Sequence, residues 1–396
     1  MTVIHAALHA LTLAAEMGWL LLWPLILGFG ISGAIQAVVS HKEMARLLPD
    51  DRPGSIVKAA ALGAASSSCS YAAVAITRSM IRKGADFRAA MAFQFASTNL
   101  VIELGIILAV ILGWRFTAAT WAGGAAMIVI LIVLMRFFLR PKLVEAARRQ
   151  ADKGLAGRME GHAEMDMSVS DGPLMRRLFS ADGFTAISHY FVMDWASVWV
   201  DLVGGLVIAG ALAAWVPSAV WSSVFFIHDP ALARIVGPLI GPLIAVASFV
   251  CSVGNVPLAA VLWNGGASFG GVIAFIFADL IVLPILDIYR RYYGLKVAAV
   301  LFVLFYAAMA SAGYVVELVF DAAGLVPRVH AAAIVGQGFS WNYTTFLNLG
   351  FLAVAAILLR RFLRTGGPAM LRHMEHGGGG HGHATGNHHQ GGGLRA

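Results

Sequence analysis

Long apolar stretches alternate with short polar connections along almost the whole chain. Seven of these stretches hold about 20 residues each, the length of helix that crosses the hydrocarbon core of a bilayer. We therefore predict membrane-spanning helices at 17–39, 89–112, 116–138, 195–216, 268–288, 297–319 and 345–363.

Two further apolar stretches, 57–82 and 237–262, are interrupted near their middles by residues that break helices. The first carries a run of serines before Cys69, and the second carries Pro238 and Gly254. Broken helices at membrane depth need protein or a water-filled cavity around their freed backbone groups. We predict that each stretch is a re-entrant hairpin, which enters and leaves the membrane on the same face.

The distribution of basic residues decides between this topology and one with nine crossings. If all nine stretches crossed, Lys and Arg would be shared equally between the two faces. With about seven crossings, two hairpins and the N-terminus outside, all but three of the 28 Lys and Arg residues lie on the cytoplasmic face. The positive-inside rule favours the second arrangement. We expect a multi-pass protein of the bacterial cytoplasmic (inner) membrane, surrounded by lipid, with its C-terminus in the cytoplasm.

The two interrupted stretches are copies of one another. The segment CSYAAVAITRSMIRKGADFRAAMAFQFAS begins at Cys69, and CSVGNVPLAAVLWNGGASFGGVIAFIFAD begins at Cys251; they align without a gap. Each copy lies in a half with an odd number of crossings, so the second half is inserted upside down. The sequence thus predicts an all-α polytopic membrane protein, built as an inverted-topology repeat whose hairpin tips meet near the membrane midplane. The predicted parts are a first repeat (1–140), a cytoplasmic linker (141–184), a second inverted repeat (185–322), an extra terminal helix (323–365) and a His/Gly-rich cytoplasmic tail (366–396).

Composition agrees with a location in lipid. The mean hydropathy is +0.78, and only 12% of the residues are charged, against about 25% in soluble proteins. The net charge of +7 comes from the cytoplasmic loops of the predicted topology rather than from a basic surface. We therefore expect no nucleic-acid partner.

The chain has two cysteines, Cys69 and Cys251, and the repeat places them at equivalent points beside the helix breaks. Cysteine is often a small buried apolar side chain, but two equivalent thiols at two hairpin tips also suit a soft, thiophilic ligand. We take both as candidate substrate ligands. Polar neighbours that could complete the site are Ser68, Ser70, Ser252, Asn255 and Asn99.

Two carboxylates lie inside predicted spans, Asp279 in 268–288 and Glu103 in 89–112. Ionisable residues at this depth are costly and are functional candidates by default. We predict that Asp279 or Glu103 carries a proton, with a hydrogen-bonded structural carboxylic acid as the alternative. Four other acidic residues lie nearer to segment ends, where we expect contact with solvent or the interface: Asp194, Asp287, Glu317 and Glu16.

The C-terminal tail combines histidine with glycine. Its histidines include His381, His383, His388 and His389. Such a tract can bind a transition-metal ion loosely but has no fixed geometry. It is either a weak metal site or a segment without a binding role.

The motif CSVGNVPLA at 251–259, followed by GGASFGGVIAFIFAD, resembles the ArsP-type permease family. That family repeats a Cys-Ser-x-Gly-x-x-Pro-Leu-Ala motif, and the resemblance covers most of 17–320. The first copy has Ala72 and Ala75 where the motif has Gly and Pro. The resemblance implies a permease and, in some members, efflux of trivalent organoarsenicals with cysteines as candidate arsenic ligands. By position, that role falls on Cys69 and Cys251.

These observations predict a secondary permease that exports a soft metalloid compound, with proton exchange as the coupling and a facilitator as an alternative. No GxxxxGK[ST] motif is present, so ATP is not the direct energy source, and we expect no cofactor. A transition-metal ion with the tail as acceptor is a second possible substrate. A thiol-dependent intramembrane enzyme is a different class, but the sequence offers no HExxH, CxxC or Ser/His/Asp set for it. A non-transporting membrane subunit would leave the carboxylates unexplained.

Overall fold

The computed structural model describes residues 3–38, 48–66, 70–151, 169, 174–217, 220, 223–225, 229–248, 252–330, 332 and 343–370, and every regular element in these ranges is a helix. The first half of the chain contains α1 (Val3–Val38), α3 (Pro53–Ser66), α4 (Ser70–Arg82), α5 (Phe87–Asn99), α6 (Ile102–Ile111), α7 (Trp114–Phe138) and α8 (Pro141–Ala151). The second half contains α10 (Leu174–Phe179), α11 (Ala181–Trp215), α13 (Pro230–Ser248), α14 (Asn255–Asn264), α15 (Phe269–Phe277), the 3₁₀ turn η1 (Ala278–Leu280), α16 (Leu283–Tyr293), α17 (Leu295–Ala322) and α18 (Tyr343–Arg364).

The helices of the second half follow those of the first in the same order. α1 corresponds to α11, α3 to α13, and α4 to α14, while α5, α6 and α7 correspond to α15, α16 and α17. In each half the second of the short helices ends in a turn with a glycine of positive φ, Gly84 at 99° and Gly266 at 92°. The next helix then begins after a capping side chain, Asp86 or Ser268. Glycine adopts positive φ without a steric penalty, and the caps satisfy free backbone N–H groups. The duplicated sequence therefore explains why both halves turn at the same place.

Most of the predicted crossings are present as apolar helices. Within the described ranges, the segments long enough to cross a membrane are Ile4–Ala34, Phe87–Ile111, Trp114–Phe138, Leu295–Ala322 and Tyr343–Arg364, with Phe269–Leu280 and Leu283–Tyr293 as one further span bent by 42°. The remaining predicted crossing, 195–216, overlaps α11, where Leu202–Trp215 is apolar but shorter than a membrane span. The protein is therefore an all-helical chain with the apolar helices of an integral membrane protein.

The helices of the first predicted hairpin are individually too short to cross a bilayer. α3 has 14 residues and α4 has 13. At about 1.5 Å per residue, each is roughly 20 Å long, whereas the hydrocarbon core is about 30 Å thick. Neither helix alone can therefore cross the bilayer.

The predicted crossings at 89–112 and 268–288 are both present, but each is interrupted by a break that the sequence pattern did not predict. The first breaks between α5 and α6, where three consecutive polar side chains bond back to carbonyls of their own helix: Ser97 to Gln94, and Thr98 and Asn99 to Phe95. Such side chains compete with the helical hydrogen-bond ladder. The second breaks at η1, and a proline lies in the first turn of α16 that follows.

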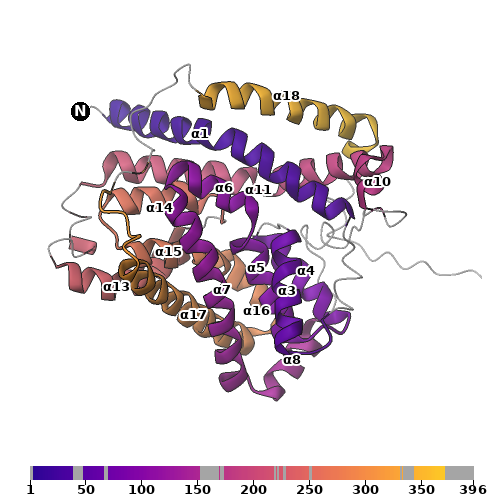
Figure 1. Ribbon diagram of the computed structural model, residues 1–396, viewed down its shortest axis with the longest axis horizontal. Helices are drawn as coiled ribbons and strands as arrows, with labels where there is room; N and C mark the ends of the chain where they lie inside the picture. Colours follow the sequence, from indigo (N-terminus) through magenta and orange to yellow (C-terminus); the bar gives the residue numbers. More distant parts are fainter. Residues whose placement is uncertain are drawn as a thin grey trace, which may run out of the picture.

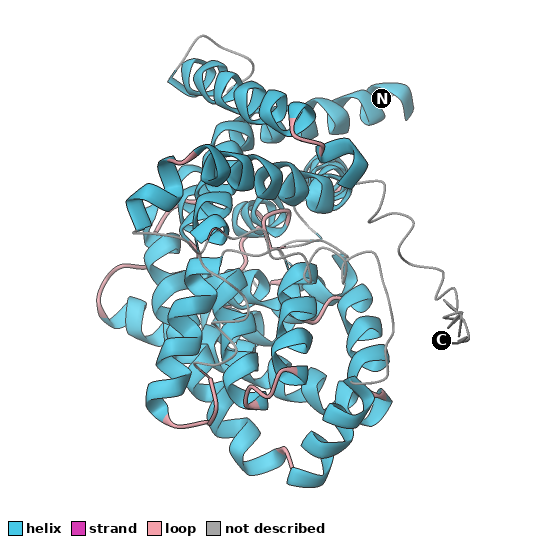
Figure 2. Ribbon diagram, turned by 90° about the vertical axis from the view of Figure 1, so that its right-hand side faces the viewer, coloured by secondary structure: helices cyan, strands magenta, loops and turns pink. Residues whose placement is uncertain are grey.

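The helices form two groups. α1, α11 and α18 contact one another and form a layer along one side of the molecule (Figure 1). The remaining long helices pack below this layer, as the turned view shows (Figure 2). α3 packs on α5, α13 packs on α15, and α7 packs on α17 across the two halves. α18 is fastened to α1 by Asn348, which accepts a hydrogen bond from Trp23 N at 2.9 Å and donates one to Trp19 O at 2.8 Å. This amide therefore inserts into the backbone ladder of α1.

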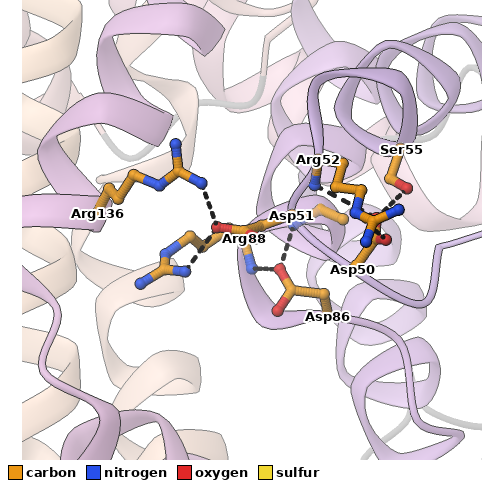
Figure 3. A network of polar contacts seen from close by, with 8 residues as sticks. Asp50, Asp51, Arg52, Ser55, Asp86, Arg88 and Arg136 are labelled. Carbon is orange, nitrogen blue, oxygen red and sulfur yellow. Dashed lines mark hydrogen bonds and ion pairs between the residues drawn. The ribbon is translucent and has the colours of Figure 1, made fainter.

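In the first half, ion pairs join the ends of three helices. Asp51, just before α3, accepts a hydrogen bond from Arg88 of α5 at 2.8 Å and lies 3.5 Å from a guanidinium nitrogen of Arg136 of α7 (Figure 3). Next to it, the Ser55 hydroxyl donates a hydrogen bond to Asp50 and lowers the pKa of that exposed carboxyl. One carboxylate thus holds two cations at this end of the molecule.

In the second half, the corresponding three helices are joined with the charges exchanged. Arg234 of α13 forms two hydrogen bonds with Asp321 of α17, at 2.8 and 3.1 Å, and lies 3.7 Å from Glu317. Glu317 also accepts a hydrogen bond from the backbone N–H of Gly270, at the start of α15. Here one arginine pairs with two carboxylates. Corresponding helix ends are therefore joined by ion pairs in both halves, but the positions of the positive and negative residues are exchanged.

Candidate functional site

The two repeats meet at a pair of serines and one carboxylate. Ser70 Oγ donates a hydrogen bond to Asp279 Oδ2 at 2.6 Å, and Ser252 Oγ lies 3.4 Å from Ser70 Oγ. Ser70 and Asp279 are fully buried, and Ser252 is 5% exposed. Ser70 and Ser252 occupy equivalent points of the sequence repeat, so the two repeats contact each other through equivalent serines.

Helix ends, rather than helix middles, position these groups. Ser70 is the first residue of α4, Asp279 lies in η1 directly after α15 ends, and Asn99 is the last residue of α5. Ser252 and Asn99 also lie within interaction range of the Asp279 carboxyl group. A helix N-terminus carries partial positive charge and a C-terminus partial negative charge. The site therefore combines two helix ends that favour anions, the starts of α4 and α14, with two that favour cations, the ends of α5 and α15.

Two oxygen atoms of this cluster have no hydrogen-bond partner among the described residues. They are Asp279 Oδ1 and Asn99 Oδ1. The Asn99 orientation follows from its amide nitrogen, which donates to Thr98 Oγ1 at 2.9 Å and to Phe95 O at 3.3 Å. Exchanging the nitrogen and oxygen would lose both bonds. Buried polar atoms are almost always satisfied by protein, water or ions, so these acceptors mark a place for a ligand.

The other described candidates lie around this cluster. Asn255 is fully buried at the first position of α14, one turn beyond Ser252. Glu103 is 6% exposed in the first turn of α6. Its side chain fills the space beside Gly28 of α1, where an added Cβ would overlap it. The hydrogen bonds between Ser70, Ser252 and Asp279 do not include Glu103.

Several predicted site residues lie outside the described ranges. They are Cys69, Cys251, Ser68, His381, His383, His388 and His389. The two cysteines directly precede Ser70 and Ser252 in the sequence. Within the described ranges no group of three or more His, Cys, Asp or Glu side chains could hold a metal ion. The roles of the thiols and of the tail histidines therefore stay predictions.

Two acidic residues expected near solvent are buried instead. Asp194 is 8% exposed and Glu317 is 4% exposed. Asp194 accepts hydrogen bonds from Ser32 at 3.2 Å and from Gln36 at 3.3 Å, both on α1. The expectation failed because α11 begins well before the apolar stretch that marked it. The spacing of Ser32 and Gln36 by four residues, which places them on one helix face, is the signal that could have revealed this polar contact.

A buried pair between the two repeats was also missed. Gln94 of α5 donates a hydrogen bond to the hydroxyl of Tyr289 of α16, and both side chains are fully buried. Gln94 stands inside a stretch that is otherwise apolar, and a lone amide at membrane depth needs a partner. The isolation of this amide in the sequence is the signal that could have revealed the buried contact.

Comparisons with known proteins agree on one family. A model of the ArsP_1 family, described as "Predicted permease", matches residues 6–318. A Mycobacterium tuberculosis protein named "Putative permease Rv2963" is 57% identical over 338 residues, which are 85% of this chain and 83% of that protein. The "UPF0718 protein YcgR" of Bacillus subtilis is 29% identical over 111 residues, or 28% of this chain and 37% of that protein. No solved structure matches the chain.

Proposed function

Because the chain belongs to the ArsP_1 family of predicted permeases, we propose that it is a secondary permease, not an enzyme, that exports a soft metalloid compound such as a trivalent organoarsenical. The observation that carries this proposal is the meeting of Ser70, Ser252 and Asp279 inside the helical bundle. A ligand at this point would meet hydroxyls and a carboxylate, and each of the two serines follows a cysteine in the sequence. Thiols select soft centres, and the substrate class follows from them.

The proposed architecture is an inverted repeat with two re-entrant hairpins, α3–α4 and α13–α14. Three observations support it. The helices occur in the same order in both halves, repeat-equivalent serines meet, and the ion pairs at the helix ends carry exchanged charges. In an inverted repeat these ends lie on opposite faces, and the arginine-rich end at Asp51 is the one that the positive-inside rule places in the cytoplasm.

Proton exchange through Asp279 or Glu103 is the proposed coupling. Both carboxylates are buried, and both lie in apolar segments long enough to cross a membrane. No ion pair between described residues includes Asp279. A carboxyl group without a fixed cation can alternate between charged and neutral forms as the access to the site changes. Asp279 touches the hairpin serines and is the first choice for this role.

Uptake into everted membrane vesicles, in which an exporter moves its substrate inward, tests whether the two thiols bind the substrate. We expect Cys69→Ala and Cys251→Ala each to reduce uptake of methylated trivalent arsenicals at least about tenfold, because tenfold corresponds to only about 1.4 kcal/mol and a thiolate–metalloid contact is worth more than that. Cys→Ser variants provide the matched control for size. The same vesicles are assayed with Cu, Zn and Ni ions. Full transport by the double alanine variant would show that the thiols are not ligands.

Labelling of single cysteines tests the topology. In a background with Cys69 and Cys251 replaced by alanine, we expect a cysteine at position 50 to be protected from a membrane-impermeant maleimide in intact cells and a cysteine at position 265 to react. The reason is that the two positions lie at the bases of hairpins that enter from opposite faces. Permeabilised cells provide the control, since both positions should then react. Labelling of both positions in intact cells would contradict the inverted arrangement.

A further inference from the structure

The unsatisfied oxygens at the centre of the molecule describe a site for a cation. We propose that a sodium ion binds between Asp279 Oδ1 and Asn99 Oδ1, beside the hydroxyl of Ser252. Asp279 and Asn99 are both fully buried, both oxygens lack a partner among the described residues, and Asn99 and Ser252 lie within interaction range of the Asp279 carboxyl group.

The donors of the cluster are already used. The Ser70 hydroxyl gives its proton to Asp279 Oδ2. The Asn99 amide directs its hydrogens to Phe95 O and Thr98 Oγ1. Ser252 Oγ lies 3.4 Å from Ser70 Oγ, and the Ser252 hydroxyl and the Asn99 amide are also within hydrogen-bond range of the Asp279 carboxyl group. Asp279 Oδ1 and Asn99 Oδ1 still lack a partner among the described residues, and a small cation would satisfy both oxygens.

The charge and chemistry of the ligands favour a monovalent hard ion. Carboxylate, amide and hydroxyl oxygens are ligands of hard cations rather than of soft ones. The cluster supplies a single carboxylate, which balances one positive charge, and the described residues contain no group of His, Cys, Asp or Glu side chains suited to a divalent metal. The C-terminal ends of α5 and α15 also lie here, and their partial negative charge opposes the partial positive charge at the start of α4.

The position suits a coupling ion. Interrupted helices of secondary transporters bind Na⁺ or H⁺ at their half-helix C-terminal ends near the midplane. Asp279 belongs to one repeat, whereas Asn99 belongs to the other, so an ion between them would join the two halves. Only the coupling role of this ion, in which Na⁺ takes the place of the proton, rests on the proposed permease function. The binding of Na⁺ does not rest on it, because binding is measured without transport.

Thermal unfolding of the purified full-length protein tests the site. At constant ionic strength and pH, we expect NaCl to raise the melting temperature by several degrees above choline chloride, in a saturable manner, with KCl producing a much smaller rise. Asp279→Asn and Asn99→Ala should remove the Na⁺ response. Asp287→Asn, which changes an exposed aspartate paired with Arg290 and Arg291, should retain it. Ser252→Ala provides a milder variant if Asp279→Asn does not fold, and should weaken the response at least about tenfold in the Na⁺ concentration required.

Three results would overturn the inference. They are equal melting temperatures in NaCl and choline chloride, an equal response to K⁺, and a Na⁺ response that survives both Asp279→Asn and Asn99→Ala. Binding of ²²Na⁺ to the detergent-solubilised protein gives a second readout, with saturation at one ion per chain expected. The outcome is separable from the proposed function. A protein that binds Na⁺ but exports no metalloid contradicts the permease proposal alone, and export without Na⁺ binding contradicts the site alone.

Discussion

Asp279→Asn is expected to reduce transport strongly while leaving the protein, compared in Na⁺-free buffer, at least as stable as the native chain. The carboxylate is buried with one hydrogen bond, from Ser70, and one oxygen without a partner. A charge at the centre of a bilayer costs about 2.5–3.5 kcal/mol on insertion scales. If Asp279 only accepted the bond from Ser70, a neutral amide of the same shape would serve better. We therefore expect transport to fall more than about tenfold, which is about 1.4 kcal/mol in a barrier.

The measurement is substrate flux in proteoliposomes together with thermal unfolding of the same preparation. Asp287→Asn is the matched control, because Asp287 lies eight residues further on but pairs with Arg290 and Arg291 at an exposed helix end. Asp279→Glu asks whether the charge alone is sufficient. A structural role for Asp279 predicts the reverse pattern, in which Asp279→Asn retains transport and any loss follows lowered stability.

The part of the site that the sequence predicted is the part carried by the repeat. A gap-free duplication requires Ser70 and Ser252 to occupy equivalent positions, and the predicted inverted repeat would turn those positions toward each other. The structure places the two hydroxyl oxygens 3.4 Å apart. Asp279 could be chosen for a related reason, since an ionisable side chain inside an apolar stretch stands out against its neighbours.

The positions at which helices begin and end could not be predicted from the sequence repeat. The breaks after Asn99 and Leu280 occur within stretches whose hydropathy is continuous, so a count of apolar residues reads each as one helix. The polar run Ser97, Thr98 and Asn99 contains the signal, but only the structure shows these side chains bonding back to their own helix. The burial of Asp194 failed for a similar reason, because the length of α11 exceeds the apolar segment within it.

The ion pairs at the helix ends show a further limit of sequence reasoning. Asp51 with its two arginines and Arg234 with its two carboxylates hold corresponding helices. The residue types differ in sign, so an alignment of the repeats shows no similarity there. What the two halves share is the location of the ion pairs at corresponding helix ends, and this location is visible only in the three-dimensional structure. Charge patterns therefore supported a prediction of topology, but they did not predict that ion pairs join corresponding helix ends in both halves.

The packing of the first hairpin against α5 gives the second large expected effect. Gly63 of α3 lies against the backbone of Phe93, and a Cβ added at Gly63 would overlap Phe93 O and lie 2.9 Å from the Cβ of Ala96. Backbone atoms cannot rotate away as a flexible side chain can. We expect Gly63→Ala to lower the free energy of unfolding by about 1–3 kcal/mol, the usual cost of overpacking, and to displace α4 and Ser70 from Asp279.

Gly54→Ala is the matched control, because Gly54 belongs to the same helix and has no atom within 4 Å of an added Cβ. Alanine there should leave stability unchanged or raise it by up to about 1 kcal/mol through helix propensity. The second half offers a repetition of the test, since a Cβ at Gly241 of α13 would overlap Gly271 O of α15. Melting temperature and flux are measured for all three variants. If Gly63→Ala and Gly241→Ala behave like Gly54→Ala, the hairpins are not held against α5 and α15 as described. If both lose flux together with stability, close backbone contact is what fixes the hairpin tips at the central site.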